Sequence, residues 1–107
     1  MSIEDTDVVD FVSVDASGDV ELTISDHLDW EDTERHIELL QNKIHRYLDF
    51  IESGELHESN PAVAGKRVVI RIRAKFPPVR RAIEFFSFIR GVVEQTGITL
   101  VSGQSTD

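Results

Sequence analysis

The sequence contains no cysteine among its 107 residues. A disulfide framework, a thiolate nucleophile and any zinc site built on sulfur are therefore excluded. No apolar run approaches the length that spans a membrane, and the acidic start Met1–Asp5 lacks the basic and apolar segments of a signal peptide. We expect a cytoplasmic protein.

Motifs for phosphate or calcium are also missing. The sequence has no glycine-rich phosphate loop, because Gly91 and Gly97 fall at a mid-helix position and at a helix end. Asp15 and Asp19 share the spacing that opens a calcium loop, but Gly18 is misplaced and the closing glutamate is absent. We expect no cofactor and no bound metal.

Charge is distributed unevenly along the chain, whose net charge is −9. Residues 1–34 hold twelve carboxylates and neither lysine nor arginine, whereas residues 66–81 hold seven of the eleven basic residues and no acid. The seven are Lys66, Arg67, Arg71, Arg73, Lys75, Arg80 and Arg81. Because the net field repels polyanions at long range, the charge disfavours nucleic-acid binding.

Composition is that of an ordinary folded domain, with 40% hydrophobic and 29% charged residues. A chain of this length can bury one core. We expect a single domain over residues 1–107, with flexible ends at residues 1–6 and 102–107.

The first half of the chain predicts a β-hairpin and a helix. Two β-rich runs, Val8–Asp15 and Val20–Ser25, are separated by a short turn that contains Gly18. A helix follows, with Asp29 at its N-cap and Gly54 at its C-terminal cap. Its apolar residues recur at three- and four-residue spacing. They are Ile37, Leu40, Ile44, Leu48 and Ile51.

The second half predicts two more strands around a second helix. A polar connection over residues 55–65 leads to a strand over residues 67–76, which Pro77 and Pro78 end. A helix over residues 79–96 and a short strand over residues 98–101 complete the order ββαβαβ. One face of the strand over residues 67–76 is apolar: Val68, Ile70, Ile72, Ala74 and Phe76.

This order predicts an α+β fold. A strand, helix and strand in succession form a crossover unit whose two strands are parallel in one sheet. Since the second and third strands each have only one apolar face, both helices should cover the same side. The prediction is a two-layer α/β sandwich, with a four-stranded mixed sheet and two helices on one face.

The open sheet face should then carry the side chains of Arg71, Arg73 and Lys75. Two interpretations follow. Acids of the hairpin, such as Glu21, neutralise these cations across the strands. Alternatively, the three cations bind an anion or a nucleic acid.

The second helix carries more apolar residues than one sheet contact needs. Ile83, Phe86, Ile89 and Val93 form one buried stripe, and a second row lies beside it. The second row is Phe85, Phe88 and Val92. Phe85 and Phe88 either pack under the first helix or the long polar connection, or the row forms a protein interface, such as that of a two-fold homodimer.

The run Ser25–Asp29 gathers a hydroxyl, an imidazole and the two carboxylates of Asp26 and Asp29 at the junction between a strand and a helix. A hydrolase would be centred on Ser25, His27 and Asp29. A small hydrolase would need these groups within hydrogen-bond reach of one another. Adjacent strand residues point to opposite faces, so turning and capping of the chain by Ser25, Asp26 and Asp29 explain the run better. His36 and His45 point to opposite sides of the first helix and do not form a metal site together.

A further pattern extends over nearly the whole chain. Its most distinctive stretch is Thr23–Trp30 (TISDHLDW), followed by Phe50–Glu55 (FIESGE). Its other positions are Leu40, Gln41, Lys43, Tyr47, Pro61, Gly65, Lys75 and Phe76. On these residues the chain resembles a family of small uncharacterised bacterial domains of unknown function. The resemblance implies no activity and no site residue.

Taken together, these patterns favour a protein-interaction or accessory module without catalytic activity. Its partner would be a protein, bound by the acidic hairpin and first helix, or a second copy held by the second helix. Two alternatives remain. They are anion or nucleic-acid binding by the basic strand, and a hydrolase centred on Ser25, His27 and Asp29.

Overall fold

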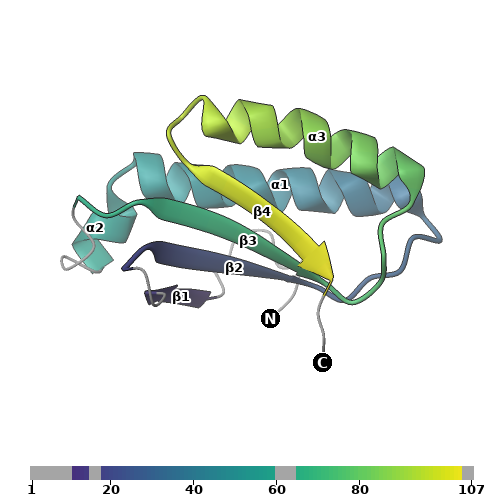
Figure 1. The fold of residues 1–107 in the computed structure, drawn as a ribbon, viewed down its shortest axis with the longest axis horizontal. Coiled ribbons are helices and arrows are strands. Elements are labelled where there is room, and N and C mark those ends of the chain that lie inside the picture. Colours follow the sequence, from purple (N-terminus) through teal and green to yellow (C-terminus); the bar gives the residue numbers. More distant parts are fainter. Residues whose placement is uncertain (1–10, 15–17, 60–64, 105–107) are drawn as a thin grey trace.

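A computed structural model describes residues 11–14, 18–59 and 65–104. Within these residues the chain forms a four-stranded sheet and three helices (Figure 1). Their order is β1 (Phe11–Val14), β2 (Val20–Asp26), α1 (Thr33–Glu52), α2 (Glu55–Ser59), β3 (Val68–Ala74), α3 (Arg80–Glu94) and β4 (Thr99–Gln104). The predicted α+β class and the order ββαβαβ are confirmed, with the short helix α2 added.

The sheet is mixed, as the sequence predicts. Strands lie in the order β1-β2-β3-β4; β1 is antiparallel to β2, and β2, β3 and β4 are parallel. The hairpin between β1 and β2 turns near Gly18, whose φ of 87° lies in the left-handed region that glycine adopts readily. The remaining residues of the predicted first strand lie outside the described residues.

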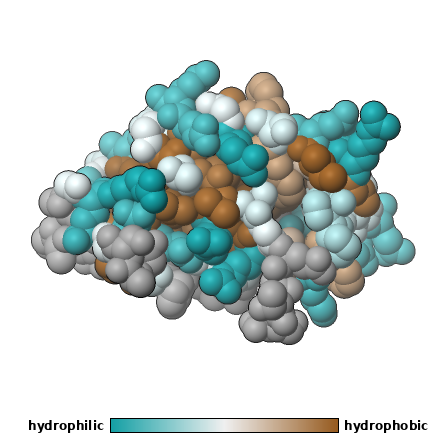
Figure 2. Space-filling view, viewed as in Figure 1, coloured by the Kyte–Doolittle hydropathy of each residue, from teal (hydrophilic) through white to brown (hydrophobic). Residues whose placement is uncertain are grey.

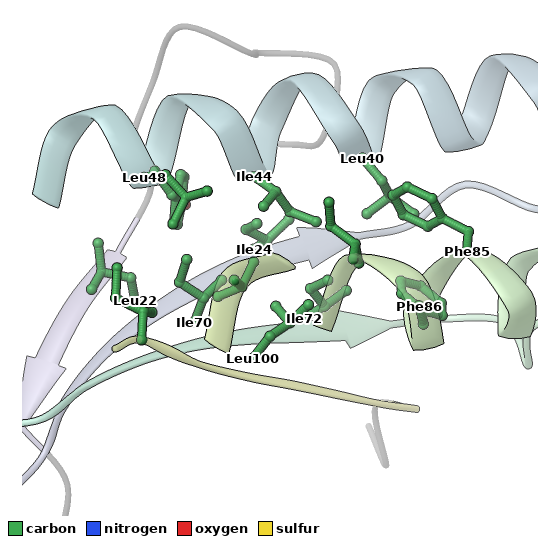
Figure 3. Close-up of a cluster of buried hydrophobic side chains, with 14 of the residues drawn as sticks. Leu22, Ile24, Leu40, Ile44, Leu48, Ile70, Ile72, Phe85, Phe86 and Leu100 are labelled. Atoms are coloured by element: carbon green, nitrogen blue, oxygen red, sulfur yellow. The ribbon is translucent and has the colours of Figure 1, made fainter. Parts of the chain in front are cut away.

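Both long helices, α1 and α3, lie on one side of the sheet (Figure 1). Alternate strand residues face them, because successive side chains of a strand point to opposite faces. In Figure 3 the labelled strand side chains point toward α1, and Leu40 of α1 meets Phe85 of α3. The strand side chains of this core include Val20, Leu22, Ile24, Ile70, Ile72 and Leu100.

Helix α1 begins at Thr33, four residues after the predicted N-cap. Asp32 is the N-cap, and its Oδ1 accepts the N–H of Arg35 at 3.2 Å. The carboxylate of Asp29 instead accepts the N–H of Glu31 at 3.1 Å. Local side-chain bonds of this kind compete with the helix, so the residues before Asp32 form turns. Gly54, with a φ of 89°, follows the helix as predicted.

Other boundaries differ from the prediction by a few residues. Residues 55–59, predicted as a polar connection, form α2, which is anchored because Leu56 is fully buried. Strand β4 continues to Gln104, three residues beyond the predicted strand, because its backbone remains paired with β3. No helix among the described residues is long and apolar enough to cross a membrane.

Truncation of a core isoleucine tests where the core lies. Ile44 is fully buried, so Ile44→Ala should lower the free energy of unfolding by about 2–5 kcal/mol, because it removes apolar contact and leaves a cavity. Ile83 is 54% exposed, and Ile83→Ala should cost about 1 kcal/mol or less. Urea denaturation measures both values, and equal losses would contradict the assignment of the core.

Candidate functional site

The carboxyl ends of the three parallel strands meet at one end of the sheet. The register places Asp26 of β2 beside Ala74 of β3, and Ala74 beside Gln104 of β4. Both α1 and α3 begin at this end, on the right of Figure 1. In open sheets with parallel strands, ligands bind at the carboxyl ends of the strands. This end is therefore the candidate site.

A buried acid–imidazole pair joins β2 to α1 at this end. His36 Nε2 lies 2.6 Å from Asp26 Oδ2, and the side chains are only 2% and 1% exposed. The other carboxylate oxygen of Asp26, Oδ1, accepts the N–H of Leu28 at 3.2 Å. Its backbone carbonyl accepts the N–H of Lys75 at 2.8 Å. Asp26 therefore connects β2 to α1, to the next turn and to the end of β3.

The partners of His36 determine where its protons lie. Nδ1 lies 2.9 Å from the carbonyl oxygen of Asp29, which can only accept a hydrogen bond, so Nδ1 carries a proton. Nε2 and the Asp26 oxygen are close enough that a second proton must lie between them. Both ring nitrogens are thus occupied, and the ring cannot take a proton from a substrate.

The indole of Trp30 stacks on this imidazole. The ring centroids are 3.6 Å apart and the planes are inclined by 18°. Trp30 also lines a cavity of about 80 Å³ between the start of α3 and the ends of β3 and β4. Its other lining residues are Ile72, Ala74, Pro78, Phe86, Ser102 and Gly103. Trp30 Nε1 is buried and has no hydrogen-bond acceptor among the described residues.

An apolar surface borders this cavity. We call Phe76, Pro78, Val79 and Ile83 the apolar end surface; all four are exposed. Figure 2 shows apolar side chains at the start of α3 standing among hydrophilic ones. Phe86 follows Ile83 by three residues on α3, so apolar side chains lead from this surface into the cavity.

The basic strand face is partly neutralised within the chain. Arg71 and Arg73 lie on the sheet face away from the helices, as predicted, because their neighbours Ile70 and Ile72 enter the core. Arg71 Nε lies 3.0 Å from Glu21 Oε1. The hairpin acid Glu21 therefore neutralises the charge of Arg71, as the first interpretation of the basic strand expects. Arg73 is exposed, and the Lys75 ammonium lies 5.6 Å from the Phe76 ring centroid.

The second apolar row of α3 divides between core and surface. Phe85 is buried against α1, Val92 packs against the core from its edge, and Phe88 is 69% exposed. Packing under the first helix is thus correct for Phe85. The prediction that Ile83 is buried is wrong, because Ala82 occupies that part of the core and turns Ile83 outward.

The residues of the hydrolase hypothesis separate at the end of β2. Ser25 lies on the open sheet face, opposite to Asp26. The side chains of Ser25 and His27 are both exposed. Asp29 bonds its own turn, as the turn interpretation predicts. His36 is buried whereas His45 is exposed, so the two histidines point apart as expected. No three histidine or acidic side chains of the described residues are grouped to hold a metal ion.

Sequence reasoning named Asp26 as a turn residue and considered His36, but it missed the burial and the pairing of the two side chains. Asp26 continues the alternation of Val20, Leu22 and Ile24, a signal that its side chain faces the core. His36 lies one turn before Leu40 and shares its face. Tyr47, also on this helix, donates from its hydroxyl to the carbonyl of Thr23 at 2.8 Å.

These observations define a class: a two-layer α/β sandwich with an apolar cavity at the carboxyl ends of its parallel strands. The chain belongs to the family of unknown function DUF6572, whose model matches residues 1–106. This agrees with the resemblance to a family of uncharacterised small domains. No curated protein matches the chain, and no solved structure does.

Loss of either member of the buried pair should destabilise the fold. Asp26→Ala and His36→Ala should each lower the free energy of unfolding by about 3–5 kcal/mol, because the remaining partner stays buried without its hydrogen bond. The double variant should lose clearly less than the sum of the two.

Urea denaturation of the unmodified chain, the two single variants and the double variant gives the free energies of unfolding for a double-mutant cycle. Glu38→Ala is the control, since its ion pair with Arg35 is exposed and should contribute less than about 1 kcal/mol. Additive losses for Asp26 and His36 would show that the two side chains do not act together.

Proposed function

We propose that this chain is a protein-interaction module without catalytic activity. Its binding surface is the apolar end surface, and its partner is a protein segment that combines an apolar anchor with acidic residues. The observation that carries the proposal is the concentration of exposed apolar side chains between Phe76 and Ile83, beside a cavity that Pro78 lines.

Exposed apolar residues elsewhere in the described chain are scattered. Five large hydrophobic side chains are strongly exposed, and Phe76, Val79 and Ile83 are three of them. The other two, Val14 and Phe88, lie on β1 and in the middle of α3. Isolated apolar residues are normal on protein surfaces, whereas a cluster beside a cavity is typical of binding sites.

Charge complementarity favours an acidic partner segment. The net charge of the chain is −9, yet Lys75, Arg80 and Arg81 are interspersed along the chain with the residues of the apolar end surface, and residues 66–83 contain no acid. Arg81 forms an ion pair with an acid of α1, Glu34, at 3.3 Å between exposed side chains, and an exposed pair of this kind is weak enough to be exchanged for an acid of the partner. Such rim charges guide association and select the partner.

The buried histidine supports a non-catalytic role. His36 has a carboxylate partner, the usual arrangement for a general base. Its ring is 2% exposed and both nitrogens are occupied. It therefore holds the fold together at the site and is closed to a substrate.

Affinity capture followed by reconstitution tests the proposal. The immobilised protein is incubated with a lysate of its source organism, retained proteins are identified, and binding is repeated with the purified partner. We expect Ile83→Asp to weaken binding at least about tenfold, because a desolvated carboxylate would oppose the anchor. Arg80→Glu should slow association and reduce its salt dependence.

Val14→Asp is the matched control, since Val14 is 55% exposed and Ile83 is 54% exposed. The control variant should bind the partner as the unmodified chain does. Two results would contradict the proposal. In one, binding is equally sensitive to both substitutions. In the other, the protein is a dimer in solution that Ile83→Asp dissociates, which would make a second copy the occupant of this surface.

A further inference from the structure

Strand β4 is an edge of the sheet, because within the described chain it pairs with β3 alone. In a parallel ladder the backbone groups of successive residues turn to alternate neighbours. The N–H of Val20 donates to the carbonyl of Arg67 at 2.8 Å, so Arg67 and the odd-numbered residues of β3 face β2. The even-numbered residues of β3, such as Ile70, therefore bond to β4.

The register then shows which backbone groups of β4 are directed outward. Ile70 is opposite Leu100 and bonds to the residues on either side of it, so Leu100 and Ser102 turn their N–H and C=O groups away from β3. The side chain of Arg90 on α3 supports this direction, because its Nε donates to the Leu100 carbonyl at 3.4 Å. We call the backbone of Leu100 and Ser102, on the side away from β3, the free edge.

The free edge lacks the features that usually prevent another strand from pairing with an edge. Thr99–Gln104 contains no charge and no proline, and its pairing with β3 has no bulge over all 6 residues. Arg90 lies over the edge, but its bonds to Leu100 O and Ser102 Oγ are both 3.4 Å long. Strong bonds of this type measure about 2.7–3.2 Å, so an incoming N–H can replace the guanidinium.

Charge on the open sheet face favours an acidic strand at this edge. Arg73 is exposed and takes part in none of the ion pairs between described residues, whereas Arg71 is held by Glu21. The register partner of Arg73 on β4 is Gly103, where an added Cβ would meet nothing within 4 Å among the described residues. A strand beside β4 would lie about 10 Å from β3, a distance that an arginine and a glutamate side chain span together.

The helix side of the same edge is apolar. Ile83 precedes Arg90 by seven residues, close to two full turns, so both project from the side of α3 that overhangs β4 (Figure 1). Ile83 is part of the apolar end surface and is 54% exposed. The free edge is therefore continuous with that surface.

We propose that the partner segment binds as an additional β-strand along the free edge, with acidic side chains on the open sheet face and apolar side chains under α3. The inference rests on the proposed function, because it states how the acidic and apolar partner segment is held. Main-chain hydrogen bonds to Leu100 and Ser102 supply affinity, and contacts with Arg73 and Ile83 select alternating acidic and apolar residues.

The probe is the peptide acetyl-Glu-Val-Glu-Val-Glu-amide, whose alternation is the same in both directions and suits either orientation of an added strand. At saturation, the amide protons of Leu100 and Ser102 should exchange with solvent at least about tenfold more slowly, as measured by ¹⁵N-detected hydrogen exchange. The amides of Thr99 and Val101 already face β3 and should change little. Uniform protection along β4, or no protection, would overturn the inference.

Two control peptides separate strand addition from charge attraction. The same peptide with N-methyl groups on its three central residues keeps every side chain but loses those donors, so it should bind at least about tenfold more weakly. The peptide acetyl-Lys-Val-Lys-Val-Lys-amide should bind weakly to a similar degree, because it meets Arg73 with like charge. The inference fails if either control binds as tightly as the probe.

Variants of the protein make the same distinction. Ser102→Pro removes an outward N–H and leaves the bonds to β3, so it should abolish peptide binding and retain the fold. Arg73→Glu should weaken binding at least about tenfold and reduce its dependence on salt. Arg35→Glu, on α1, makes the same change in net charge and should bind the peptide as the unmodified chain does. Equal effects of the two charge reversals would contradict a contact with Arg73.

The partner identified by affinity capture distinguishes the inference from the proposed function. If its binding is lost in Ile83→Asp but unchanged in Ser102→Pro, the proposed function holds and strand addition is overturned. If the peptide protects the free edge but binding of the captured partner depends on neither residue, the proposed function fails. Protection of the Leu100 and Ser102 amides in the free protein, lost on dilution, would identify a second copy as the occupant and would also overturn the inference.

Discussion

The hydrogen bond between Asp26 and His36 is the interaction on which the functional end of this protein depends. It joins the last residue of β2 to the first turn of α1 across ten residues of chain, at 2.6 Å and away from water. Burying two polar groups is favourable only when each is fully hydrogen-bonded. Here the second carboxylate oxygen and the second ring nitrogen also have partners. The pair therefore determines how the segment between β2 and α1 is folded.

The position of Trp30 follows from that pair. Its indole stacks on the imidazole and forms one wall of the cavity at the ends of β3 and β4. Phe86 of α3 also lines the cavity, as does Pro78 of the apolar end surface. A surface built on packed strands and helices is pre-organised, which lowers the entropy lost on binding. This is the physical link between the core of the domain and the proposed binding of a partner.

Sequence patterns predicted the layers of the fold but not the site. Alternation in β2 and β3 and the spacing of Ile37, Leu40 and Ile44 depend on local geometry, and the structure confirms the one-sided sheet that they indicate. The bond between Asp26 and His36 depends on how the chain turns between them, which spacing along the sequence does not reveal. Ile83 shows the same limit, because Ala82 and Ile83 both fit an apolar stripe and only tertiary packing determines which is buried.

The protons of His36 provide the most direct measurement of the central claim. In a ¹⁵N-labelled sample, the account predicts a slowly exchanging N–H proton on Nδ1 of His36 and a second slowly exchanging proton shared between Nε2 and Asp26, with a nuclear Overhauser effect from this ring to Trp30. Both protons should be protected, because the pair is buried and each has an acceptor. A His36 ring without a proton on Nδ1, or protons of the pair that exchange freely with water, would contradict the account.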